Sequence, residues 1–415
     1  MLGNRGARIS ASLAFLLNAG LAGCGPRQAG HSGEAPLVSV VISRASGPVE
    51  IQSTDPQPLR LESARSAPVA LENTQVLSVR APGDGSLRLE VTGGPSGWSS
   101  VVAPPLRIQG RHSVRVDGTR YPHEVRLEVD ELGALRVINV TDLETYLRGV
   151  VPNEIGFMEY DVRGAIEAQA VASRTYALWR TRQPGGGALQ STVMDQVYGG
   201  IDSWHPISDE SIRATRGTVL LAREGLAWTL FHSTCSGRTD AVELMWPKQG
   251  PRSYLEGGDD LDPLGRPWCT GSKYFDWEER WPADELESVL RVSLAEEFPG
   301  FDVPVGPPGS IGVEIFATSE TGRVAEAGLS AWGRTFFLRG ERIRWVLRRP
   351  GGDSILRSSR ITEISEGDTL RIAGQGWGHG LGMCQVGALE RARRGADWRS
   401  ILEAYYPGTR PEERY

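Results

Sequence analysis

Two segments of the chain combine residue types that can do chemistry. Residues 142–176, DLETYLRGVVPNEIGFMEYDVRGAIEAQAVASRTY, contain the carboxylate Glu154. Residues 374–409, GQGWGHGLGMCQVGALERARRGADWRSILEAYYPGT, begin with glycine at alternate positions. A carboxyl group among apolar neighbours acquires a raised pKa and can serve as a general acid and base. Alternate glycines let another backbone or a ligand approach closely, so these segments are the candidate functional site.

Helical periodicity on both sides of Glu154 predicts how this carboxylate is positioned. Apolar residues recur at helical spacing over residues 143–151, and a capping box of Thr141 and Glu144 would begin this first helix. Pro152 should end it. We therefore expect Glu154 in a tight connection, among apolar neighbours that raise its pKa.

A second helix is predicted after Asp161, a residue type that often caps helix N-termini. Gln169, Ser173 and Tyr176 form a polar stripe on this otherwise small, alanine-rich helix. A buried stripe without partners would cost stability, so it should border a polar groove. We expect Gln169, Arg174 and Tyr176 to line the groove, with Arg174 holding a carboxylate or carbonyl.

The glycine-rich segment carries three side chains that could contact a sugar. Trp377 offers a flat surface on which a sugar ring could stack, and His379 and Gln385 offer hydrogen bonds. We predict that all three bind substrate.

The strings YLRGVVPNE and EAQAVASRTYAL closely resemble the SpoIID/LytB family. Its sporulation members are lytic transglycosylases of peptidoglycan, and other members are described as amidase enhancers. The resemblance implies that Glu154, the glutamate of the V-x-x-E motif, is the catalytic acid and base. The C-terminal segment is similar to the family's GHGxGMSQyGA motif, although Cys384 replaces serine and Val386 replaces tyrosine. The likeness extends over residues 36–410.

The resemblance implies a reaction that needs one carboxyl group and no cofactor. Glu154 would protonate the glycosidic oxygen between N-acetylmuramic acid and N-acetylglucosamine, and would then accept the proton of the sugar's own 6-hydroxyl as a 1,6-anhydro ring closes. The expected partners are glycan strands of peptidoglycan stripped of stem peptides. The alternative is a non-catalytic wall-binding protein that stimulates or recruits an N-acetylmuramoyl-L-alanine amidase.

Cysteine and histidine residues between the two segments raise a separate question. His232, Cys235 and Cys269 are candidate metal ligands, because family members hold a zinc near this site. They supply three of the four ligands of a structural zinc, and the metal would require a turn at Ser233 and Thr234. A Cys235–Cys269 disulfide is equally compatible with an oxidising compartment, and His232 could instead be a hydrogen-bonded strand residue.

The N-terminus resembles a lipoprotein export signal. Residues 1–23 contain two arginines, an apolar run and the sequence Leu-Ala-Gly, followed by Cys24. We expect cleavage before Cys24, lipidation of its thiol, and a secreted protein that meets the membrane through this anchor alone. Simple signal cleavage is the alternative. Residues 24–35 have the composition of a flexible tether.

Composition and periodicity predict an α+β fold, with a β-rich scaffold and a few helices that frame a substrate groove. Short alternating apolar runs fill residues 36–130, and residues 131–410 would form the catalytic core. Residues 277–290 predict one further helix. A net charge of −6 without a basic run argues against nucleic-acid binding.

Overall fold

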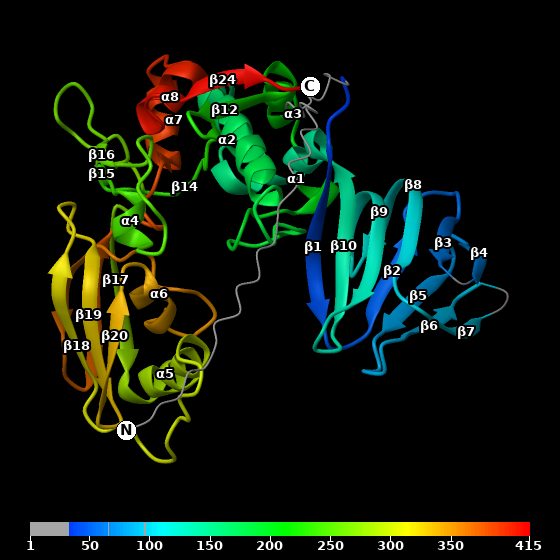
Figure 1. The fold of residues 1–415 in the computed structure, drawn as a ribbon, viewed down its shortest axis with the longest axis horizontal. Helices are drawn as coiled ribbons and strands as arrows, with labels where there is room; N and C mark the ends of the chain where they lie inside the picture. Colours follow the sequence, from blue (N-terminus) through cyan, green and yellow to red (C-terminus); the bar gives the residue numbers. More distant parts are fainter. Residues whose placement is uncertain (1–32, 65, 95–96) are drawn as a thin grey trace, which may run out of the picture. The chain divides into compact units, whose positions relative to one another are not determined.

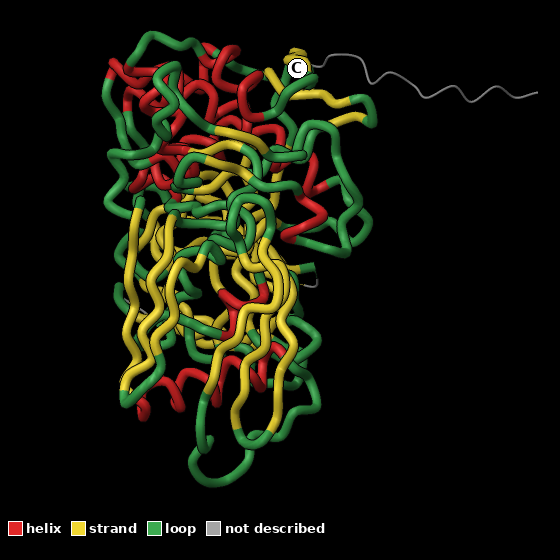
Figure 2. Tube along the Cα trace, turned by 90° about the vertical axis from the view of Figure 1, so that its left-hand side faces the viewer, coloured by secondary structure: helices red, strands yellow, loops and turns green. Residues whose placement is uncertain are grey.

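The computed structural model describes residues 33–64, 66–94 and 97–415. The predicted signal segment, Cys24 and most of the tether lie outside the described residues. Eight α-helices accompany many strands in the described ranges, which confirms the predicted α+β class (Figures 1 and 2). None of the helices in these ranges has the length and apolar character needed to cross a membrane.

The largest sheet has eleven strands in the order β11-β1-β10-β9-β8-β2-β5-β6-β7, with β3 pairing both β8 and β4. Alternation along the strands sends one side of the sheet into the core, as in β6, where every second residue is buried. The strands are β1 (Leu37–Ala45), β2 (Val49–Ser53), β3 (Leu59–Ser63), β4 (Ser66–Leu71), β5 (Val76–Arg80), β6 (Leu87–Thr92), β7 (Trp98–Val102), β8 (Leu106–Val116), β9 (Thr119–Val129), β10 (Leu135–Asp142) and β11 (Leu189–Gln190).

The helices that follow this sheet pack around one central helix, α2 (Arg163–Thr181). Its buried alanines, such as Ala168 and Ala172, let α1, α3, α7, α8 and β12 approach closely. The elements are α1 (Leu143–Ile155), α2 (Arg163–Thr181), α3 (Pro206–Ala214), β12 (Thr218–Ala222), β13 (Gly225–Leu226), β14 (Phe231–His232), β15 (Arg238–Thr239), α4 (Val242–Met245), β16 (Gly258–Asp259), β23 (Met383–Cys384), α7 (Gln385–Arg393), α8 (Trp398–Tyr405) and β24 (Arg410–Glu413). Short 3₁₀ turns lie at Tyr160–Val162 and Gly200–Ser203.

Residues 276–375 build a second hydrophobic core of their own. It consists of β17 (Asp276–Pro282), α5 (Ala283–Glu297), β18 (Gly312–Thr318), β19 (Val324–Ala331), β20 (Arg334–Arg339), α6 (Arg342–Val346), β21 (Ile361–Ser365) and β22 (Thr369–Gln375). These strands form two three-stranded sheets, β17-β22-β21 and β18-β19-β20. Figure 1 shows the strands of the second of these sheets side by side.

The helix predicted at residues 277–290 is half wrong. Trp277, Glu279 and Trp281 are buried at alternate positions, so this first part is strand β17, and the helix begins only after Pro282. The predicted domain division between residues 130 and 131 stays a prediction. In the structure, β9 and β10 pair across this point and contribute to the same core.

Candidate active site and cysteine cluster

Glu154 lies in the last turn of α1, not in the connection predicted after Pro152. The helix continues past this proline and ends at Gly156, which with φ 76° adopts the left-handed conformation of a C-cap and donates to the Pro152 carbonyl at 3.2 Å. Its N-cap is Asp142, whose carboxylate accepts from the Thr145 N–H at 3.0 Å. The predicted capping box is therefore also wrong.

The Glu154 carboxyl is half-buried and receives two hydrogen bonds. The backbone N–H of Val197 donates to its Oε1 at 2.6 Å, and the side chain of Gln385 donates as well. Loss of hydration raises the Glu154 pKa to about 7, and the two donors counteract part of this rise. Near neutral pH the group can therefore both give and take a proton.

A row of amides links Glu154 to the central helix. The side-chain amide of Gln385 donates to Oε1 of Gln169 at 3.3 Å, and the Gln169 amide nitrogen donates to the Ser173 hydroxyl at 3.0 Å. Gln169 is fully buried. The structure thus brings two predicted substrate-binding residues, Gln169 and Gln385, behind the carboxylate, where they orient it.

Tyr176 acts on the same carboxylate through the loop that contains Val197. Its hydroxyl donates to Asp195 at 2.8 Å, and Asp195 also accepts from Arg180 and from the Gln190 N–H. Asp195 thereby holds the loop from which Val197 donates to Glu154. The sequence did not lead us to predict roles for Asp195 and Val197, although the string DQVYGG at 195–200 was an available signal.

Arg174 does not line a groove as predicted. Its guanidinium is fully buried and forms a bidentate ion pair with Glu144, at 2.7 and 2.9 Å. It also donates to the carbonyls of Thr218 and Ile212. The expected carboxylate and carbonyl contacts are present, but they tie α2 to α1, α3 and β12.

The glycine-rich loop approaches β14 so closely that side chains would collide. A Cβ at Gly378 would come within 2.6 Å of the His232 Cβ, and one at Gly382 within 2.1 Å of the Leu230 carbonyl oxygen. Both glycines have positive φ, at 110° and 64°. This close approach lets β23 pair in parallel with β14.

Trp377 and His379 contact other aromatic rings of this region. The Trp377 ring meets Tyr274 edge-on, with centroids 3.9 Å apart. His379 lies 5.3 Å from the Trp246 ring and 5.5 Å from the His232 ring. Burial lowers the His379 pKa to about 4, so this ring is neutral near pH 7. Within the described chain, the loop's contact with Glu154 comes from Gln385.

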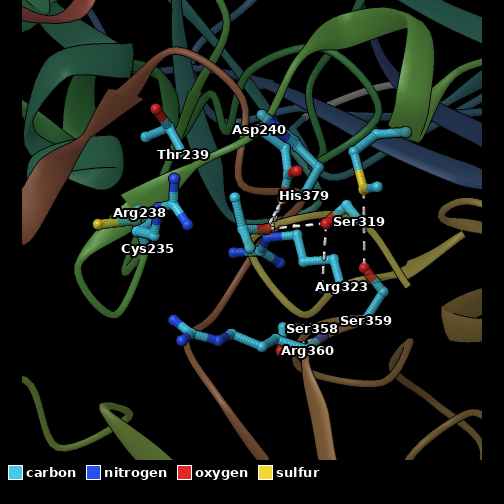
Figure 3. Close-up of polar contacts among 12 residues, drawn as sticks. Cys235, Arg238, Thr239, Asp240, Ser319, Arg323, Ser358, Ser359, Arg360 and His379 are labelled. Atoms are coloured by element: carbon cyan, nitrogen blue, oxygen red, sulfur yellow. Dashed lines mark hydrogen bonds and ion pairs between the residues drawn. The ribbon is translucent and has the colours of Figure 1, made fainter. Parts of the chain in front are cut away.

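A buried ion pair braces the same loop. The Arg323 guanidinium lies 3.2 Å from the Asp240 carboxylate and donates to the Gly378 carbonyl at 3.3 Å (Figure 3). The Asp240 N–H donates to Gly380 at 2.9 Å, and a Cβ on Gly380 would strike the guanidinium. Arg323 enters from the second core, so this core supports the loop that positions Gln385.

Three thiols and one imidazole meet beside this loop. The ligand atoms of His232, Cys235 and Cys384 lie within 4.8 Å of one another, and all three residues are buried. His232 Nε2 is buried without a hydrogen-bond partner among the described residues, whereas Nδ1 lies 3.1 Å from the Leu381 carbonyl. These groups could hold a metal ion. The chain bends at Ser233, Thr234 forms a β-bridge with Trp377, and the turn comes later, at residues 236–237.

The disulfide alternative does not appear in the structure. Cys235, Cys269 and Cys384 are free thiols, and the sulfurs of Cys235 and Cys269 are 3.7 Å apart. Hydrogen bonds from the other two thiols lower the Cys269 pKa. Burial raises the pKa of Cys235 and of Cys384. Cys384 was absent from the predicted ligand set because the loop brings it to Cys235 from 149 residues away.

Sequence comparisons identify relatives of this arrangement. The family model described as stage II sporulation protein, SpoIID, matches residues 131–221. The amidase enhancer of Bacillus subtilis (strain 168) is 27% identical over 296 residues, which cover 63% of this chain and 40% of the relative. Stage II sporulation protein D of the same strain is 27% identical over 289 residues, covering 65% and 74%. Its counterpart in Bacillus amyloliquefaciens is 28% identical over 283 residues, covering 64% and 73%.

The match therefore spans well under half of the amidase enhancer but most of the two sporulation proteins. The matched segment 131–221 contains α1, which carries Glu154, the neighbouring helix α2, and the 195–200 loop, whose Val197 N–H donates to Glu154. Residues 131–221 therefore match the SpoIID family, and the chain is a distant homologue of the amidase enhancer and of stage II sporulation protein D.

Proposed function

We propose that this protein is a lytic transglycosylase that cleaves glycan strands of peptidoglycan. The observation that carries the proposal is the Glu154 carboxyl, whose pKa of about 7 suits a group that must first donate and then accept a proton. Kinship with stage II sporulation protein D and the amidase enhancer supports the choice of a cell-wall substrate.

The proposed reaction uses Glu154 twice. Its proton passes to the glycosidic oxygen as the bond to the anomeric carbon of N-acetylmuramic acid breaks, and the N-acetylglucosamine hydroxyl leaves. The carboxylate then accepts the proton of the 6-hydroxyl, whose oxygen bonds to the anomeric carbon and closes the 1,6-anhydro ring. The nucleophile belongs to the substrate, so no second carboxylate is needed to activate water. Val197 and Gln385 would stabilise the carboxylate between the two transfers.

Product analysis tests this proposal. The purified chain is incubated with glycan strands stripped of stem peptides, and 1,6-anhydro products are measured by mass spectrometry. We expect Glu154→Gln to slow their formation by about 10²- to 10⁴-fold. The control is Glu159→Gln, which removes an exposed carboxylate five residues further on and should leave the rate unchanged. Equal products from wild type and Glu154→Gln would refute the proposal.

A second candidate function rests on the amidase enhancer relative. The chain would then bind the cell wall and stimulate or recruit an amidase without cleaving glycan. In that case the chain should raise amidase turnover on sacculi, and Glu154→Gln should stimulate as well as wild type does.

We further propose that His232, Cys235 and Cys384 hold a structural zinc ion. Soft thiolates and an imidazole with an unpaired nitrogen suit zinc, and a fully buried ligand set is typical of structural sites. Cys269 offers a fourth sulfur beside Cys235. The ion would crosslink β14, the following loop and the start of α7, and it would take no part in the chemistry at Glu154.

For the cellular location, we propose a secreted protein anchored through a lipid on Cys24. The support is the export signal and the Leu-Ala-Gly-Cys sequence at its end. Expression with a labelled fatty acid should label wild type but not Cys24→Ala. Label on Cys24→Ala, or none on wild type, would refute this proposal.

A further inference from the structure

The outer face of the β18-β19-β20 sheet has a hollow beside two exposed aromatic rings. Phe316 on β18 and Phe337 on β20 are 46% and 69% exposed, and their ring centroids are 6.1 Å apart. Gly328 of β19 pairs with Phe337, and a Cβ there would come within 2.7 Å of the Phe316 ring. Glycine at this position therefore lets the Phe316 ring lie close to the sheet.

Hydrogen-bonding groups surround these rings. The hydroxyls of Ser330 and Thr335 lie 3.3 Å apart on neighbouring strands. Glu366 accepts from the Val313 N–H at 2.8 Å, which fixes its carboxylate at the rim, and Glu314 adds another carboxylate. The resulting hollow has a volume of about 510 Å³. This is the size range of sites for small ligands.

We propose that this hollow is a second carbohydrate site, which binds the glycan strand away from Glu154. The apolar face of a sugar ring would stack on Phe316 and Phe337, while its hydroxyls donate to Glu314 and Glu366 and exchange hydrogen bonds with Ser330 and Thr335. This assignment rests on the proposed function for the identity of the glycan. It would hold the enzyme on an insoluble polymer between cleavage events.

The surroundings favour a glycan over a protein partner. A stable protein interface buries about 800 Å² on each side, with an apolar centre. Here Phe316 and Phe337 are the large exposed apolar side chains of the hollow, and the Glu326–Arg339 ion pair, at 3.2 Å, lies beside them on the same sheet. The N-acetylglucosamine units of the strand are neutral and hydroxyl-rich and offer one apolar face, so they match this small mixed surface, whereas the carboxylate-bearing N-acetylmuramic acid units would be repelled by Glu314 and Glu366. The sheet also belongs to the second core, whereas α1 belongs to the first.

Binding to denuded glycan strands tests the site. The full chain with Glu154→Gln serves as the parent, so that the strand is not consumed, and affinity is measured by titration calorimetry. We expect the added double substitution Phe316→Ala and Phe337→Ala to weaken binding about tenfold. Leu132→Ala, which trims a side chain 83% exposed in the β9–β10 turn, is the matched control and should bind like the parent.

Cleavage by chains that keep Glu154 separates this inference from the proposed function. The double variant should retain the wild-type kcat on a short soluble fragment and show a higher KM on long strands. If the parent binds no glycan, or if the double variant binds with the parent's affinity, the second site is refuted. If the double variant loses affinity but wild type forms no anhydro product, the proposed function fails and the second site stands.

Discussion

Two neighbouring residues, Cys384 and Gln385, belong to two very different clusters. Gln385 faces Glu154, where one titratable group is half-buried and receives neutral donors. Cys384 faces a closed cluster of three thiols and His232, where several titratable groups perturb one another. The arrangement around Glu154 sets the pKa of a proton donor, whereas the thiol and imidazole cluster suits a metal ion that links β14 to the glycine-rich loop. One glycine-rich loop delivers both, so a change in the loop should affect both clusters, whereas changes within one should spare the other.

Metal removal should have the largest effect. If a zinc ion joins His232, Cys235 and Cys384, stripping it with a chelator should lower the free energy of unfolding by about 5 kcal/mol. Cys384→Ser should lose the metal, measured by elemental analysis, and Cys269→Ser should bind it more weakly, because it removes the fourth sulfur. If the chain contains no metal and its stability is unchanged by a chelator, the proposed zinc crosslink is refuted.

The brace beneath the loop comes next. Arg323→Met should destabilise the fold by about 3 to 5 kcal/mol in urea titrations, because it leaves the Asp240 carboxylate buried without its cation. The control is Arg339→Met, which removes an exposed arginine of β20. It should lower the free energy of unfolding by less than about 1 kcal/mol. Equal losses for the two variants would show that the buried pair does not brace the loop.

Glu154 itself should destabilise the protein at high pH. The folded chain keeps the Glu154 proton up to about pH 7, whereas the unfolded chain loses it near pH 4.5, so this group makes stability fall as pH rises between these values. Glu154→Gln removes the effect. We expect the variant to be more stable than wild type by about 3 kcal/mol at alkaline pH and equally stable at acidic pH. Parallel stability curves would contradict the raised pKa.

Gln385 should have the smallest effect. Its hydrogen bond lowers the Glu154 pKa, so Gln385→Leu should raise that pKa further. The alkaline limb of the cleavage rate, where Glu154 loses its proton, should move upward by about 0.5 to 1 pH unit. Gln183→Leu, which removes a distant amide of the α2 end, is the control. If the alkaline limb of the pH–rate profile does not shift, Gln385 does not influence the Glu154 pKa.

Local patterns predicted both helices around Glu154, but not what happens at their ends. α1 runs past Pro152 and ends at the left-handed C-cap Gly156, because a proline weakens a helix without always ending it. The strand at residues 276–282 was missed because its tryptophans fit a helical pattern nearly as well as an alternating one.

Contacts between residues far apart in the chain could not be predicted from the sequence. Glu144 looked like a capping residue, and its actual partner Arg174 lies 30 residues later. Cys384 joined Cys235 only through the fold of the glycine-rich loop. Such contacts depend on tertiary structure, and no periodicity or spacing reports them.

The most direct test of the central claim is a carbon-13 NMR titration of the Glu154 carboxyl, assigned by comparison with Glu154→Gln. A midpoint of about 7 is predicted for the folded protein. A midpoint near the ordinary glutamate value of 4.5 would contradict the account, because the carboxyl would then be ionised before it could donate its proton.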